Sequence, residues 1–123
     1  HTVMRCVRLI FLGVEEPMRF TSYVQDRRLT VALRGEIDHH CAREIMQELA
    51  EKLDLYLPLF CVLDFRDVTF MDSSGIAVVI STLRRMKALG GRLQLQNLPP
   101  QPAKVLQAAG IERIAEIREE CIK

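Results

Sequence analysis

The sequence predicts a single α/β domain built on a mostly parallel sheet. The chain has 123 residues, a length that suits one domain with one hydrophobic core. Strand-like runs are separated by segments with apolar residues at helical spacing, in the order β-β-α-β-α-β-α-β. The run "LFCVLDF" (59–65) is almost continuously apolar, as in strands buried on both faces. Because helices between strands imply crossover connections, we expect four to five strands with helices packed on them.

The first half of the chain is expected to hold a hairpin and one helix. The runs "RFTSYVQ" (19–25) and "LTVALRG" (29–35) predict two strands, and the short linker "DRR" favours a hairpin between them. Gly35 is expected to end the second strand, and Asp38 to cap a helix that starts at His39. Pro58 marks a break before the next strand. The apolar positions of the helix that starts at His39 are Cys41, Ile45, Met46, Leu49 and Leu53.

The second half, after the strand at 59–65, is expected to add two helices and two strands. An apolar stripe predicts a helix that is stopped by Gly90-Gly91. "RLQLQNL" (92–98) alternates like a strand, "PPQP" (99–102) is expected to begin a turn, and "AKVLQAAG" (103–110) to form a short helix. "IERIAEI" (111–117) is expected to hold a last strand or its lead-in, and the tail "REECIK" to extend as helix or fray. The stripe comprises Ile76, Val79, Ile80, Leu83 and Met86.

The domain is expected to span residues 18–123, because Met18 is a candidate natural start. Residues 1–17 are then an upstream extension, a cloning remnant or an extra strand that packs on the domain. No apolar run approaches the roughly 20 residues that span a bilayer. The segment "CVRLIFLGV" is interrupted by Arg8 and lacks a small-residue cleavage site, so it resembles neither an anchor nor a signal peptide.

Charge and cysteine content narrow the classes of partner and the compartment. With 17 basic and 16 acidic residues the net charge is +1, which provides no electrostatic footprint for nucleic acid or an anionic membrane. We therefore expect a protein partner or a small ligand. None of the four cysteines forms a C-x-x-C motif, and reduced thiols fit a cytoplasmic setting. No cofactor is expected, and because there is no Walker-type phosphate loop, any nucleotide is expected to be held by the partner.

The segment "DSSG", from Asp72 to Gly75, lies at a junction between a strand-like and a helix-like run. One interpretation is that these residues only cap the helix. A second is a regulated phosphoserine, because a helix N-terminus tolerates a phosphate and the added charge would repel a partner. The residues alone leave Ser73 and Ser74 open as acceptors. A serine nucleophile is disfavoured, because no glycine stands two residues before either serine, although His39 and His40 are candidate bases.

The segment "GEIDHHC" forms a second polar junction, between the second strand and the first helix. Adjacent histidines at a helix start point in different directions, so a metal site is disfavoured. A solvated helix start and a partner-docking surface remain open for Glu36, Asp38, His39 and His40. Asp64 lies inside an apolar strand, where a charge is costly unless it is paired or near the end of the sheet. It either faces the serine junction or is partly exposed.

Three segments together, "GEIDHHCA", "VLDFRDVTFMDSSGIAVVI" and "RRMKALGGRLQL", resemble the STAS domain of bacterial anti-sigma factor antagonists. The resemblance covers residues 19–117 and is strongest to antagonists that act in sporulation. It implies a partner-switching module rather than an enzyme. The unphosphorylated form would bind an anti-sigma factor that is also a serine kinase, and so free the sigma factor. Phosphorylation would end the binding, and a serine phosphatase would reset it.

The same resemblance assigns roles to residues. It places the phosphoacceptor at Ser73, directly after Asp72, and it implies a set of partner-binding residues at both junctions. The alternative within the family is a STAS subunit of a stress-signalling or transporter-associated complex, and a sheet edge or residues 1–17 are compatible with a homodimer. The implied partner-binding residues are Asp38, His39, Asp72, Ser73, Ser74, Gly75 and Ile76.

Overall fold

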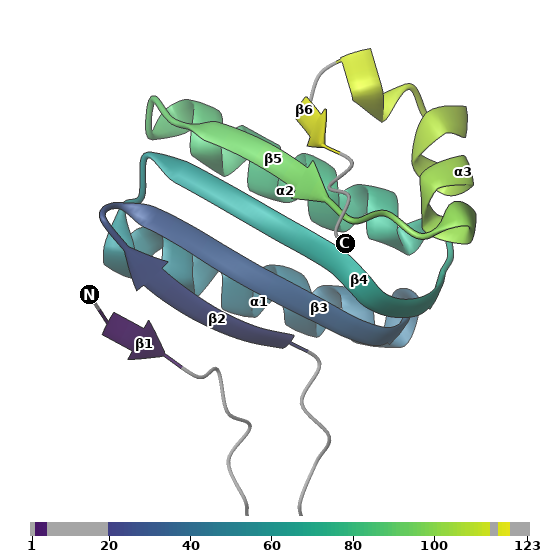
Figure 1. The fold of residues 1–123 in the computed structure, drawn as a ribbon, viewed down its shortest axis with the longest axis horizontal. Helices are drawn as coiled ribbons and strands as arrows, with labels where there is room; N and C mark the ends of the chain where they lie inside the picture. Colours follow the sequence, from purple (N-terminus) through teal and green to yellow (C-terminus); the bar gives the residue numbers. More distant parts are fainter. Residues whose placement is uncertain (1, 5–19, 114–115, 119–123) are drawn as a thin grey trace, which may run out of the picture.

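The computed structural model describes residues 2–4, 20–113 and 116–118, which form one six-stranded sheet with three α-helices (Figure 1). The strands lie in the sheet in the order of the sequence, β1-β2-β3-β4-β5-β6. The strands are β1 (Thr2–Met4), β2 (Phe20–Gln25), β3 (Arg28–Ile37), β4 (Phe60–Met71), β5 (Arg92–Gln96) and β6 (Glu116–Arg118). The helices are α1 (His39–Tyr56), α2 (Ser74–Ala88) and α3 (Pro100–Ala108), followed by a 3-10 turn, η1 (Ile111–Arg113).

Strands β2 and β3 form the predicted hairpin. They pair antiparallel from Phe20 with Leu33 to Gln25 with Arg28, which leaves two residues in the turn. Those residues, Asp26 and Arg27, have φ values of 54° and 63°. Positive φ at both central positions gives a turn whose twist matches that of the flanking strands. Beyond β2, β1 adds a further antiparallel edge strand.

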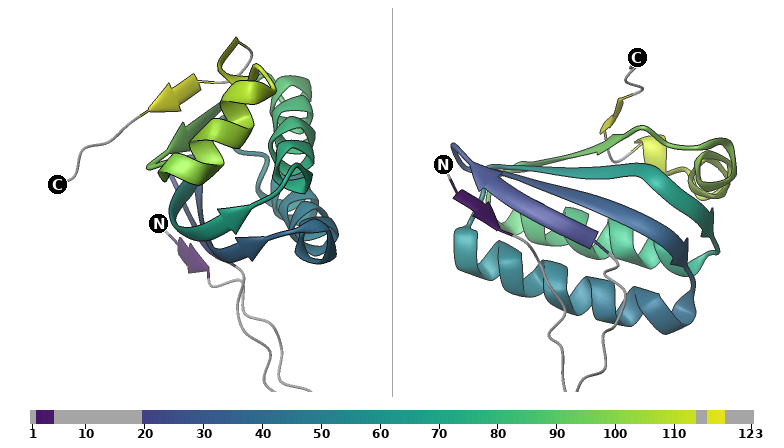
Figure 2. Two further views of the ribbon diagram at one scale, coloured as in Figure 1. Left: turned by 90° about the vertical axis from the view of Figure 1, so that its right-hand side faces the viewer. Right: turned by 60° about the horizontal axis from the view of Figure 1, so that its bottom comes forward.

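The other pairings, β3 with β4, β4 with β5 and β5 with β6, are parallel, which confirms the predicted fold class. The sheet has six strands rather than four or five, because β1 and β6, of three residues each, extend its two edges. Figure 2 shows α1 and α2 together on one face of the sheet. Right-handed crossovers between strands that follow one another across a sheet place successive helices on the same face.

The core lies between that face and the two helices. Leu29, Val31 and Leu33 alternate along β3 as buried residues, and the predicted stripe of Ile45, Leu49 and Leu53 on α1 is buried as well. The stripe on α2 is rotated from the one expected. Val78 and Thr82 are buried beside Val79, Leu83 and Met86, whereas Ile76 and Ile80 are only half-buried. The buried face of α2 is therefore centred on the row of Val79, Leu83 and Met86, and it extends to Val78 and Thr82 rather than to Ile76 and Ile80.

Three predicted boundaries are wrong. Gly35 does not end β3; with φ +79° it lies beside a register shift, and the strand continues to Ile37. Strand β4 does not stop at residue 65 but runs to Met71. Helix α3 begins at Pro100, so "PPQP" largely belongs to its first turn, where the missing N–H of a proline is tolerated. The end of the predicted tail, residues 119–123, lies outside the described residues.

Candidate functional site

The two polar junctions lie side by side at the carboxyl ends of β3 and β4. Because these strands are parallel neighbours, Glu36 is in register with Phe70, and Ile37 with Met71. The backbone N–H of Asp72 then donates to the carbonyl of Ile37 at 3.1 Å, which ties one junction to the other. This edge of an open α/β sheet is where ligand and partner sites commonly form. The structure therefore brings the segments that begin α1 and α2 into one site.

Asp38 caps α1, as predicted. Its Oδ1 accepts the backbone N–H of His40 at 3.0 Å and that of Cys41 at 3.1 Å. These hydrogen bonds, that of Cys41 first, hold the pKa of Asp38 below its usual value because they favour the ionised carboxylate. The rings of His39 and His40 are exposed, with centroids 4.1 Å apart. This junction thus presents a carboxylate and two imidazoles at the surface.

The capping of α2 falls to Asp72 rather than to a serine hydroxyl. Asp72 Oδ1 accepts the N–H of Ser74 at 2.7 Å, and its carbonyl accepts that of Gly75 at 3.0 Å. Ser73 occupies the N-cap position, but its side chain makes no capping hydrogen bond and is exposed. Ser74 is half-buried. The hydroxyl of Ser73 is therefore accessible and has no part in holding the helix.

The glycine of the motif is required by packing. Gly75 is buried, and a Cβ at this position would meet Cγ and Sδ of Met71 below contact distance and Cε at 2.9 Å. Met71, the last residue of β4, is itself fully buried. The first turn of α2 therefore rests directly on the side chain that ends β4. Contact of Gly75 or Ile76 with a partner stays a prediction.

Two residues at this site escaped the sequence analysis. Phe70 is 42% exposed, although a large aromatic side chain in a strand is ordinarily buried. Gln101, from α3, makes two hydrogen bonds to the backbone of Met71. A predicted strand that extended to Met71 would have placed Phe70 on the face opposite Met71, and so would have predicted that Phe70 is exposed. Nothing local in the sequence signals the Gln101 contact, because it joins residues that are 30 positions apart.

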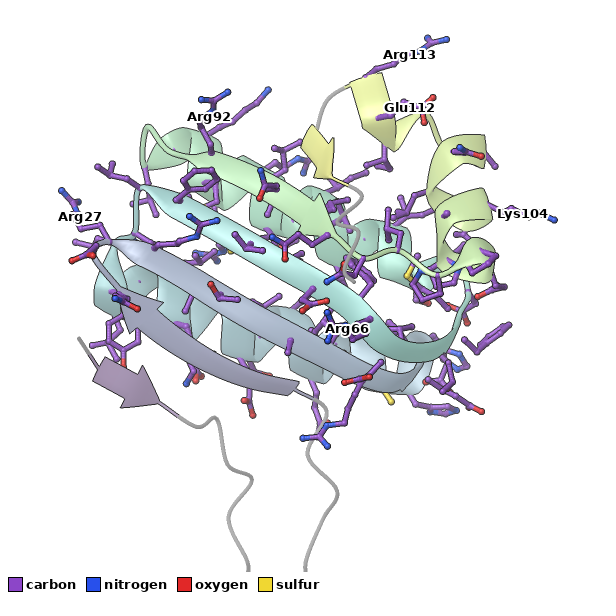
Figure 3. All side chains as sticks on the ribbon, viewed as in Figure 1. Arg27, Arg66, Arg92, Lys104, Glu112 and Arg113 are labelled. Atoms are coloured by element: carbon purple, nitrogen blue, oxygen red, sulfur yellow. The ribbon has the colours of Figure 1, made fainter. Side chains whose placement is uncertain are left out.

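Asp64 lies away from the site. It is half-buried and accepts the side-chain N–H of Asn97 and the backbone N–H of Arg66, each at 3.0 Å. Of the two expectations for this residue, partial exposure is the one observed. Figure 3 shows Arg66 on the face of the sheet opposite α1 and α2. Asp64 therefore holds the end of β5 rather than facing the serines.

The described residues contain no group of three His, Cys, Asp or Glu side chains that could hold a metal ion. Nor does any hydrogen bond among those the structure records join His39 or His40 to Ser73, so no activating base is identified. Within the part of the chain that is described, no helix has both the length and the apolarity to cross a membrane.

Comparison with known proteins gives a consistent result. The family model of the STAS domain matches residues 19–121. The anti-sigma F factor antagonist of Lysinibacillus sphaericus is 33% identical over 86 residues, which cover 68% of this chain and 74% of the relative. The anti-sigma-B factor antagonist of Bacillus subtilis (strain 168) is 34% identical over 93 residues, which cover 72% of this chain and 80% of the relative.

Solved structures agree with the family match. The anti-sigma factor antagonist SpoIIAA in its unphosphorylated form superposes with a TM-score of 0.74 at 27% identity, covering 83% of this chain and 88% of SpoIIAA. SpoIIAA in its phosphorylated form gives a TM-score of 0.67 over 83% of this chain and 91% of that one. From its sequence match and its fold, this chain belongs to the STAS domain family.

Proposed function

We propose that this protein is an anti-sigma factor antagonist that is switched by phosphorylation of Ser73. Its unphosphorylated form binds an anti-sigma factor with serine kinase activity, which releases the sigma factor, and a serine phosphatase reverses the modification. The observation that carries the proposal is the exposed Ser73 hydroxyl, which lies where two strand ends meet and takes no part in the helix cap. The names of the curated relatives, both antagonists of anti-sigma factors, support it.

The local hydrogen bonds explain how a phosphoryl group would act as a switch. Phosphorylation adds a charge of about −1.5 to −2. The first N–H groups of α2, those of Ser74, Gly75 and Ile76, already have acceptors, so they are not free to neutralise it. Asp72 stands beside Ser73, and the strand ends hold Asp38 nearby. The new charge therefore adds to an acidic surface and faces the partner.

The nucleotide bound to the kinase supplies the negative charge that repels the phosphoserine. To transfer a phosphoryl group, the kinase must bring the terminal phosphate of its nucleotide next to the Ser73 hydroxyl. After transfer, the phosphoserine and the remaining nucleotide phosphates are adjacent anions in a desolvated interface, where like charges cost several kcal/mol. Dissociation follows without any change of fold. The partner surface that we propose comprises Asp38, His39, Asp72, Ser73, Ser74, Gly75 and Ile76, with Phe70 as an exposed apolar anchor.

Intact-mass spectrometry tests the phosphorylation step. The protein is incubated with ATP and the anti-sigma kinase encoded nearest to it, beside the variants Ser73→Ala and Ser74→Ala. We expect one added phosphoryl group in the wild type and in Ser74→Ala, and none in Ser73→Ala. A gain in Ser73→Ala with none in Ser74→Ala would move the acceptor to Ser74. No gain in any form, with the kinase active on another substrate, would favour the structural-subunit alternative.

A binding titration with the same kinase tests the electrostatic part. Ser73→Ala is expected to bind like the wild type, and Ser73→Glu to bind at least tenfold more weakly because its carboxylate adds charge at the interface. Gln25→Glu is the matched control, since it adds the same charge at an exposed position on β2, at the other end of β3 from the junction. Equal affinities for Ser73→Ala and Ser73→Glu would contradict the charge mechanism.

A further inference from the structure

Strand β4 has an unpaired edge next to the serine junction. Strand β3 pairs with β4 as far as Met71, but β5 pairs with it only from Phe60 to Asp64. The stretch from Phe65 to Met71 therefore has no strand neighbour on that side among the described residues. An unpaired edge leaves backbone groups that need other partners. At Met71, which is fully buried, those groups have no access to bulk water.

The side chain of Gln101 takes the place of the missing strand at this residue. The N–H of Met71 donates to Gln101 Oε1 at 2.8 Å, and Gln101 Nε2 donates to the carbonyl of Met71 at 2.8 Å. A carboxamide carries one acceptor and one donor group in the arrangement of a peptide unit, so it completes both hydrogen bonds at once. Only Gln and Asn offer this pair on one flat group, and Asn is shorter by a methylene.

The end of β4 is thus held from both sides directly before the junction. On one side, the N–H of Asp72 donates to Ile37; on the other, Gln101 holds Met71. Successive backbone groups in a strand point to opposite edges, so these contacts together fix the strand end in the plane of the sheet. Gly75 then packs on the Met71 side chain. The position of Ser73, two residues beyond Met71, follows from these three contacts.

The sequence around Gln101 keeps that side chain in place. Helix α3 starts with Pro100, and Pro102 follows Gln101 as a buried residue. Each proline ring fixes its own φ near −65°. The N–H of Ala103 donates to the carbonyl of Pro99 at 2.9 Å, which closes the first turn. The glutamine is therefore presented to β4 from a stiff segment.

We infer that Gln101 is a positioning residue for the phosphorylation switch: through the backbone of Met71, it holds Ser73 in the position in which a kinase can phosphorylate it. This inference rests on the proposed function at Ser73. It assigns to α3, a helix outside the sequence motif, a share in presenting the modified residue. Loss of the two hydrogen bonds frees the β4 end and lowers the fraction of molecules in which Ser73 is correctly placed.

Two substitutions separate positioning from simple stabilisation. Gln101→Met keeps the chain length but removes both hydrogen bonds, whereas Gln101→Glu keeps an acceptor for the Met71 N–H and places a second oxygen against its carbonyl. Gln107→Met is the matched control, because it makes the same chemical change at an exposed position of the same helix. Ile45→Val is a second control, which weakens the core within α1, away from the junction.

The first readout is independent of any kinase. Amide hydrogen exchange followed by NMR should show the N–H of Met71 and Asp72 exchanging at least tenfold faster in Gln101→Met, and by a smaller factor in Gln101→Glu, which keeps an acceptor for the Met71 N–H. In both controls, any change in the exchange rate should be no larger than the change in global stability predicts. The second readout is the rate of Ser73 phosphorylation. We expect kcat/KM to fall about fivefold or more in the Gln101 variants, and to stay within twofold of wild type in Gln107→Met and Ile45→Val.

The outcomes of the two readouts are distinguishable. Faster exchange at Met71 with an unchanged kcat/KM would overturn the positioning role and leave Gln101 a structural contact. Unchanged exchange would show that the two hydrogen bonds of Gln101 do not hold the end of β4. A loss of kcat/KM in Ile45→Val equal to that in Gln101→Met would assign the effect to stability and also overturn the inference. If the wild type is not phosphorylated at all, the proposed function fails, and with it this role for Gln101. The exchange measurement still reports whether Gln101 holds the end of β4.

Discussion

Replacing Gly75 by alanine tests whether the motif glycine serves packing rather than backbone freedom. The new methyl group would lie below contact distance from Cγ and Sδ of Met71 and 2.9 Å from its Cε. Met71 is fully buried, so its side chain has no open space into which to move. Overpacking of this kind costs about 1–3 kcal/mol. Alanine regains up to about 1 kcal/mol of helix propensity, so we expect Gly75→Ala to destabilise the protein by about 1–2 kcal/mol.

Urea unfolding of single and double variants isolates the clash. Met71→Ala alone should cost about 2–5 kcal/mol because it leaves a cavity. In the double variant the Gly75→Ala methyl fills part of that cavity, so the double should cost about 0.5–3 kcal/mol less than the two single changes together. Ala77→Gly is the control, since it changes the helix propensity of α2 at an exposed position. A Gly75→Ala variant more stable than wild type, or strict additivity with Met71→Ala, would refute the packing account.

Two further predictions concern titratable groups. Asp38→Ala should lower the thermal midpoint, because the N–H groups of His40 and Cys41 lose their acceptor. The pKa of Asp38 is lowered from 3.8 in the folded protein, so its contribution to stability is present above pH 3.8 and is lost as the pH falls through the folded pKa. Unfolding measurements down to pH 2.5 should therefore show a smaller loss of stability with acid in Asp38→Ala than in the wild type. Identical pH dependence in the two proteins would count against the cap. Burial raises the pKa of Cys61 from 9.0 to about 12, so stability should fall as the pH rises above 9.0, where the unfolded chain loses the proton first. A thiol reagent at pH 7 should label Cys61 only after unfolding, as read by peptide mapping, and labelling of the native protein at the rate of an exposed thiol would contradict its burial.

Features that depend on neighbouring residues could be predicted from the sequence, and those that depend on distant ones could not. The Asp38 cap and the β2–β3 hairpin are local, and both are confirmed. The apolar run at 59–65 identified a buried strand but not its length, because β4 continues through the more polar stretch that ends in Met71, where β3 still pairs with it. The register that joins Ile37 to Asp72, and so unites the two junctions, is a tertiary feature.

Within the serine motif, structural and chemical duties fall on different residues. Asp72 caps α2 by accepting the N–H of Ser74, and Gly75 packs on Met71. Only the Ser73 side chain is both exposed and outside the cap. This division matters for a switch, because a group that also held the fold would couple each modification to unfolding. With marginal stability typical of small domains, such coupling would be costly. Under the proposed function, modification at Ser73 would instead alter the charge of a surface that β3, α2 and Gln101 hold in place.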